Sequence, residues 1–127
     1  MAVASKVFDI EFPVGYFMSW YVTTQGGDKI TVKLYDDERI YFERSRQDIN
    51  LLPPLDYNGE IVKGKKLKLT VISNGSSQPK EMLASINSYN VTTPSGSEVG
   101  KGINICIEDW SDGDYNDACI SLMAWKK

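Results

Sequence analysis

The chain has 127 residues, of which 42% are hydrophobic and 24% charged, and its formal net charge is −3. These values are typical of one globular domain, and no apolar run approaches the about 20 residues of a membrane-spanning helix, which predicts no membrane insertion. The mild acidic balance gives no reason to expect nucleic-acid binding. The chain has no histidine, which excludes Ser-His-Asp and Cys-His nucleophile systems and makes a zinc site unfavourable.

The first residues, Met1–Lys6, show no basic region followed by an apolar region, so the sequence predicts no signal peptide. We therefore expect a cytoplasmic protein, or one that reaches the medium or the cell surface by a non-standard route.

Alternating apolar and polar residues recur along the chain, which is the pattern of half-buried antiparallel strands. Weaker strand predictions cover Val7–Phe12, Tyr16–Thr23, Arg39–Arg44 and Met82–Val91. The clearest predictions are Lys29–Tyr35, Lys66–Val71, Gly102–Ile107 and a last strand with Ile120, Leu122 and Ala124 on one face. Turn signals such as Asn58-Gly59 separate these segments, and no long segment shows a helical period. The sequence predicts an all-β fold, an antiparallel β-sandwich of about eight to nine short strands, in one domain over residues 1–127.

Five acidic residues fall within the segment Glu108–Asp117. Without these five, the chain's 17 acidic residues fall to 12 against 14 basic ones, so this segment alone makes the chain acidic. Like charges this close repel unless a cation lies among them, and oxygen-only ligand sets favour Ca²⁺ over Mg²⁺. Asp112, Asp114 and Asn116 alternate and can point to one side, and Glu108 and Asp117 close the set. The alternative is a solvated acidic turn between two strands.

Two other interpretations of the acidic segment can be tested against the sequence. An EF-hand loop beginning at Asp112 requires Gly at position 6 and Glu at position 12. The chain has Asp117 and Met123 at these places, which excludes an EF-hand. A hydrolase with paired carboxylates is disfavoured because no second acidic cluster supplies an independent acid and base. We therefore predict no enzymatic activity.

The two cysteines flank the acidic segment symmetrically. Cys106 precedes Glu108 by two residues, and Cys119 follows Asp117 by two. If the segment joins two antiparallel strands, a register that pairs 108 with 117 also pairs 106 with 119. The sequence leaves two states open: a cross-strand disulfide, or two reduced thiols, which are the default without a signal peptide.

At the acidic segment, the chain resembles the small bacterial lectins that bind fucose and mannose through two calcium ions. The shared pattern is E-D-x-x-D-x-D-Y-N-D-A, present here at 108–118 and followed by alternating apolar residues to the C-terminus. A weaker similarity runs through 71–75 and 82–85. The resemblance implies a calcium-dependent lectin domain over 1–127, without catalytic activity, whose partners are monosaccharides and glycans of fucose or mannose type.

The resemblance also implies roles for individual residues. The metal ligands are expected to be Glu108, Asp112, Asp114, Asn116, Asp117, a backbone carbonyl near Thr24, and the C-terminal carboxylate of Lys127. That carboxylate enters the site of a neighbouring subunit, which implies a homodimer or a higher homo-oligomer. The expected sugar contacts are Asp109, Ser111, Asp112, Asp117, Gly26 and Trp110.

Three positions depart from the family or leave alternatives open. The turn Gln25–Gly27 lies where the family has its specificity loop, and a plain turn is the alternative. Trp110 replaces a small residue and is either an apolar platform for a sugar or a shield over the metals. The chain ends in Lys126-Lys127, where the family typically ends in glycine. A calcium-stabilised structural or adhesion domain that binds no free sugar is the remaining alternative function.

Overall fold

The computed structural model describes residues 2–50, 53–75, 82–108, 113 and 115–126. Within these residues the chain forms nine strands: β1 (Ala2–Asp9), β2 (Phe17–Thr24), β3 (Lys29–Tyr35), β4 (Ile40–Arg46), β5 (Asp56–Ile61), β6 (Lys68–Gly75), β7 (Leu83–Thr92), β8 (Glu98–Glu108) and β9 (Ala118–Trp125). The described part of the chain contains no helix that is long and apolar enough to cross a membrane.

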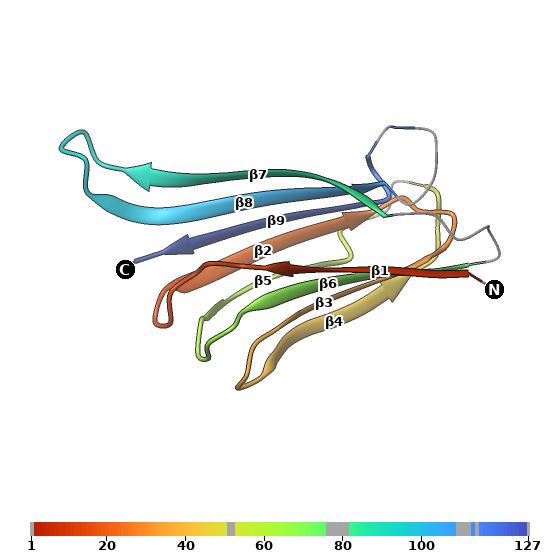
Figure 1. Cartoon of the computed structure of the whole chain (residues 1–127), viewed down its shortest axis with the longest axis horizontal. Coiled ribbons are helices and arrows are strands. Elements are labelled where there is room, and N and C mark those ends of the chain that lie inside the picture. Colours follow the sequence, from red (N-terminus) through yellow and green to blue (C-terminus); the bar gives the residue numbers. More distant parts are fainter. Residues whose placement is uncertain (1, 51–52, 76–81, 109–112, 114, 127) are drawn as a thin grey trace.

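The strands form two antiparallel sheets that face each other (Figure 1). The four-stranded sheet has the order β1-β6-β3-β4, and the five-stranded sheet has the order β5-β2-β9-β8-β7. β9 is central in its sheet, with β2 on one side and β8 on the other. The predicted all-β sandwich is therefore confirmed.

The core lies between the two sheets and is built from alternate residues of their central strands. In β3, buried and partly exposed residues alternate strictly, and Ile30, Val32 and Leu34 are fully buried. β9 shows the same alternation from Ala118 to Ala124. Because successive side chains of a strand point to opposite faces, this pattern buries one face of each sheet. β7 differs, because it is an edge strand with exposed residues on both faces.

Two turn predictions are wrong, since the turn signals Asn58-Gly59 and Asn74-Gly75 both lie inside strands. Asn58-Gly59 signals a turn in the sequence, but both residues lie inside β5, opposite Trp20 and Ser19 of β2. The glycine has a packing reason to be there: a Cβ on Gly59 would lie 2.8 Å from the Cζ of Phe17. In its present position, the ring of Phe17 occupies the space that a larger side chain at residue 59 would need. β3 has the predicted bounds, and the other predicted strands overlap the observed ones with shifted ends.

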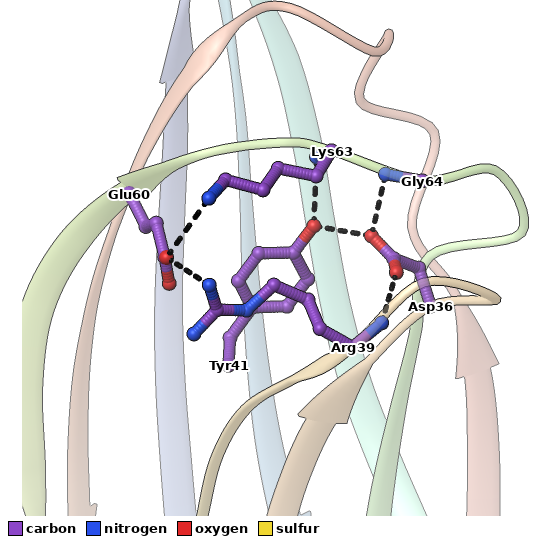
Figure 2. A network of polar contacts seen from close by, with 6 residues as sticks. All are labelled: Asp36, Arg39, Tyr41, Glu60, Lys63 and Gly64. Atoms are coloured by element: carbon purple, nitrogen blue, oxygen red, sulfur yellow. Dashed lines mark hydrogen bonds and ion pairs between the residues drawn. The ribbon is translucent and has the colours of Figure 1, made fainter.

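A polar network closes the end of the sandwich at which β3 turns into β4 (Figure 2). The carboxylate of Asp36 accepts hydrogen bonds from the Tyr41 hydroxyl, from the Gly64 N–H (3.0 Å) and from the Arg39 N–H (3.0 Å). The Lys63 N–H donates to the Tyr41 hydroxyl oxygen at 2.8 Å. The network joins the β3–β4 turn to the segment after β5.

Candidate functional site

The acidic segment joins β8 to β9 at the other end of the sandwich, where β2 also ends (Figure 1). Ala118 of β9 lies opposite both Thr24 of β2 and Ile107 of β8. Beyond these pairs, the Asp117 N–H donates to the Ile107 carbonyl, and the Gln25 N–H donates to the Asp117 carbonyl, both at 3.2 Å. The backbone of Asp117 is therefore held between the ends of two neighbouring strands.

Two acids of the segment are buried at this place. Glu108 is 1% exposed and Asp117 is 7% exposed. Ile107 and Ala118 are the last paired residues of β8 and β9 at this end, and Glu108 and Asp117 are their chain neighbours on the loop side. An ionised carboxylate loses its hydration on burial, and two adjacent negative charges raise that cost further. A cation between the two carboxylates would offset both terms.

Glu108 also holds the backbone of the acidic segment. Its Oε1 accepts a hydrogen bond from the Tyr115 N–H at 3.0 Å, and the Cys119 thiol donates to the Tyr115 carbonyl at 3.3 Å. Tyr115 has a φ of 53°, in the left-handed region, which is uncommon for a bulky residue. Such conformations persist only where the surroundings hold them, and they cluster at functional sites. No role for Tyr115 follows from the sequence, because its residue type alone carries no signal for this conformation.

The loop after β2 completes the surroundings of the buried acids. The amide of Asn116 donates to the Gln25 Oε1 at 3.4 Å, which links this loop to the acidic segment. Thr24 is 2% exposed, and its Oγ1 has no hydrogen-bond partner among the described residues. Gly26 lies close to the core, since a Cβ there would be 2.9 Å from Ile30 Cγ1.

Of the predicted site residues, the structure brings the backbone or side chains of Thr24, Glu108, Asn116 and Asp117 to the same end of the sheet, and Gly26 lies in the loop that follows Thr24. The predicted ligands Asp112, Asp114 and Lys127, and the predicted sugar contacts Asp109, Trp110 and Ser111, lie outside the described residues. Within the described ranges alone, no group of three or more His, Cys, Asp or Glu side chains could hold a metal ion.

The described groups fit a calcium ion by their chemistry. They are two buried carboxylates, an amide and a buried hydroxyl, all of which offer the oxygen atoms that a hard cation prefers.

Cys106 and Cys119 are register partners on β8 and β9, as the sequence predicts. Both are free thiols and half-buried, so the structure contains no disulfide between them. Burial, a hydrogen bond with Cys106 and the nearby charge of Asp117 raise the pKa of Cys119 to about 12. The thiol of Cys119 is therefore protonated at neutral pH and can donate its hydrogen bond to Tyr115.

No model of a protein family and no curated protein sequence matches the chain. Several solved structures do match. A Chromobacterium violaceum lectin in complex with alpha-methyl-fucoside has a TM-score of 0.61 and 18% identity, over 92% of this chain and 93% of that chain. A Ralstonia solanacearum high-affinity mannose-binding lectin has a TM-score of 0.61 and 15% identity over the same shares.

The C-terminal domain of a Burkholderia cenocepacia lectin has a TM-score of 0.61 and 17% identity, over 94% of this chain and 93% of that domain. At such low identity, these likenesses establish the fold. The chain has the β-sandwich fold of these bacterial lectins along nearly its whole length, as its resemblance to the fucose- and mannose-binding family implies.

Proposed function

We propose that the chain is a calcium-dependent lectin that binds fucose- or mannose-type sugars through two calcium ions and has no catalytic activity. The main support is the burial of Glu108 and Asp117 next to the last residue pair of β8 and β9, at the base of a segment with three further acids. The shared fold adds support, because one similar lectin was solved with alpha-methyl-fucoside and another is described as mannose-binding.

The chain's own residues would divide the work as follows. Glu108, Asn116 and Asp117, a carbonyl near Thr24, and the acids in the undescribed part of the loop would hold the ions. Bound calcium takes six to eight oxygen ligands, so it can offer positions at which vicinal sugar hydroxyls replace water. Asp117 would also accept a hydroxyl proton of the sugar in a charge-assisted hydrogen bond. Asp109, Ser111, Asp112, Gly26 and Trp110 are the other proposed sugar contacts.

Several backbone contacts would keep this site in shape before the sugar arrives. Tyr115 is held from both flanking strands, and Gln25 is tied to Asn116 and to Asp117. A preformed site lowers the entropic cost of binding, because fewer groups must be ordered by the ligand.

Calorimetry tests the proposal directly. L-fucose and D-mannose are titrated into calcium-loaded protein, and the titrations are repeated in EDTA. We expect binding only with calcium, and a loss of about tenfold or more in Asp117→Asn, since hydrogen bonds to charged groups contribute about 1.5–3 kcal/mol. Glu43→Gln is the matched control, because it removes one carboxylate charge from an exposed position of β4. Equal binding in EDTA would contradict the mechanism, and a calcium response without sugar binding would favour the structural or adhesion domain.

We also propose a homodimer in which the C-terminal carboxylate of one subunit enters the site of the other. β9 ends at the opposite end of its sheet from the acidic segment, where the Lys126 N–H donates to the Val99 carbonyl at 3.0 Å (Figure 1). The eight residues of β9 span about 27 Å. The end of β9 therefore lies far from the acidic segment of its own subunit, so the proposed carboxylate ligand would serve a neighbour.

A short C-terminal tag tests this arrangement. The tag moves the carboxylate away, so we expect weaker calcium binding and weaker sugar binding together, measured by calorimetry beside sedimentation of the same samples. An N-terminal tag is the control. Native affinities in the tagged protein would exclude a role for the terminus.

A further inference from the structure

We propose that Cys106 and Cys119 form a reversible disulfide under oxidising conditions, and that this disulfide loosens the backbone of the calcium loop. The effect on calcium binding rests on the function proposed above, whereas the disulfide and its effect on the backbone do not.

The positions of the two thiols favour a bond between them. Cys106 lies between buried Ile105 and Ile107, and Cys119 lies between Ala118 and Ile120, which are also buried. Alternation therefore points both thiols to the outer face of the five-stranded sheet. Directly opposite residues of antiparallel strands have Cβ atoms about 4.5–5.5 Å apart, close to the roughly 3.5–4.5 Å of a disulfide.

The pair is linked to the acidic segment through one described contact. The Cys119 thiol donates to the Tyr115 carbonyl at 3.3 Å, while the Tyr115 N–H donates to Glu108 at 3.0 Å. These two hydrogen bonds hold a residue with a φ of 53° next to Asn116, a proposed ligand. The Cys119 thiol is therefore part of what shapes the loop.

Oxidation removes this contact by simple chemistry. A small-molecule disulfide such as oxidised glutathione takes up two electrons and two protons, one of each from each cysteine. Its S–S bond breaks to give two glutathione thiols, and an S–S bond forms between Cys106 and Cys119. The Cys119 sulfur then has no hydrogen to donate, so the Tyr115 carbonyl loses its donor. A dithiol reductant reverses the reaction and restores the contact.

Three variants separate oxidation from loss of the hydrogen bond. Cys106→Ser cannot form the disulfide but keeps the Cys119 donor. Cys119→Ser cannot form it either, and its hydroxyl can still donate to Tyr115. Cys119→Ala has neither property, so it should mimic the oxidised protein under both redox conditions.

The experiment treats wild type and variants with oxidised glutathione or dithiothreitol. Mass spectrometry reports the loss of two hydrogen atoms, amide hydrogen exchange of calcium-free protein reports on Tyr115, and calorimetry with calcium alone reports affinity. We expect an intramolecular disulfide in wild type. Exchange at Tyr115 should be about three- to fivefold faster and calcium binding about three- to fivefold weaker, as the loss of one weak hydrogen bond requires. Cys119→Ala should show both changes without oxidant, and the two serine variants should show neither.

Each outcome decides a separate point. If no intramolecular disulfide forms, the proposal is wrong. It is equally wrong if exchange at Tyr115 is the same in oxidised wild type, reduced wild type and Cys119→Ala. If exchange responds as expected but no form of the protein binds calcium, the link between thiols and loop holds and the proposed calcium site fails.

Discussion

The two ends of the sandwich hold carboxylates in different ways. At the end of β3, the carboxylate of Asp36 accepts hydrogen bonds from the Tyr41 hydroxyl and from the N–H groups of Arg39 and Gly64 (Figure 2), and also from the N–H of Glu38. At the end of β8, Glu108 and Asp117 are both almost fully buried next to the last residue pair of β8 and β9, in a segment with three more acids. The first end has one carboxylate among several donors, whereas the second has five acids in one short segment, in which Glu108 also accepts a hydrogen bond from the Tyr115 N–H.

This difference indicates how the carboxylates at each end are stabilised. Burial alone would raise the pKa of Asp36, but its hydrogen bonds from Tyr41 and from backbone N–H groups hold that pKa below its ordinary value. The chain thus supplies by itself what a charged Asp36 needs. Adjacent buried acids gain most from a positive ion, which supports calcium as the partner of the β8–β9 end.

Calcium should therefore stabilise one end and leave the other unaffected. At a hundredfold excess over its dissociation constant, a ligand that binds only the native state adds about 2.7 kcal/mol to the free energy of unfolding. We expect EDTA to lower the melting temperature of wild type, and Asp117→Asn or Asp114→Ala to reduce the response to calcium. Asp36→Asn should melt lower than wild type yet keep the full response. A melting temperature that EDTA leaves unchanged would contradict a calcium site.

The network at the β3–β4 end should contribute independently of the ion. Asp36→Ala removes the shared acceptor, so we expect the free energy of unfolding to fall by about 2 kcal/mol, with and without calcium. Tyr41→Phe removes one hydroxyl and should cost about 1 kcal/mol. Denaturant unfolding measures both, and Glu43→Ala on the exposed side of β4 is the control. A larger loss in calcium than in EDTA would show that the two ends are coupled.

The free energy of unfolding should depend on pH as expected for a carboxyl group whose pKa is lowered in the folded protein. The ordinary pKa of an aspartate is 3.8, and the pKa of Asp36 in the folded protein is lower. The unfolded state therefore binds its proton first as the pH falls. The stabilisation by Asp36 is fully present above pH 3.8 and is lost as the pH falls through the folded pKa. Denaturant unfolding over this acid range should show a shallower dependence in Asp36→Asn, and identical slopes would contradict the assignment.

The sequence predicts those parts of the fold in which one side of a strand is buried. β3 has the predicted bounds, since Ile30, Val32 and Leu34 alternate with polar residues over the whole strand. β5 could not be predicted, because its glycine packs against the ring of Phe17, which lies on another strand. Contacts across strands were predictable only where symmetry around a loop set the register, as for the two cysteines.

The candidate site likewise has features that the sequence predicts and features that it does not. The acids of the β8–β9 segment stand out by their density in the sequence. Tyr115 has a left-handed backbone conformation and two hydrogen bonds to residues of the flanking strands. Residue types alone predict neither feature. The link between Asn116 and Gln25 joins two loops that are far apart in the sequence.

The smallest expected effect sharpens the ligand assignment at the end of β2. Thr24 is 2% exposed, and its Oγ1 has no hydrogen-bond partner among the described residues. Thr24→Val replaces this hydroxyl with a methyl group of similar size, which removes a buried polar atom. In EDTA, we expect the free energy of unfolding to rise by about 1 kcal/mol in denaturant unfolding. Thr23→Val, at a partly exposed neighbouring position, is the control and should change little.

Calcium calorimetry on the same variant distinguishes the two oxygen atoms of Thr24. The proposed ligand near this residue is a backbone carbonyl, which the substitution leaves in place, so the affinity should match that of wild type. A loss of about tenfold, or about 1.4 kcal/mol, would instead make Oγ1 the ligand. The buried hydroxyl would then be retained for the ion despite its cost to the calcium-free fold, and the backbone assignment would be wrong.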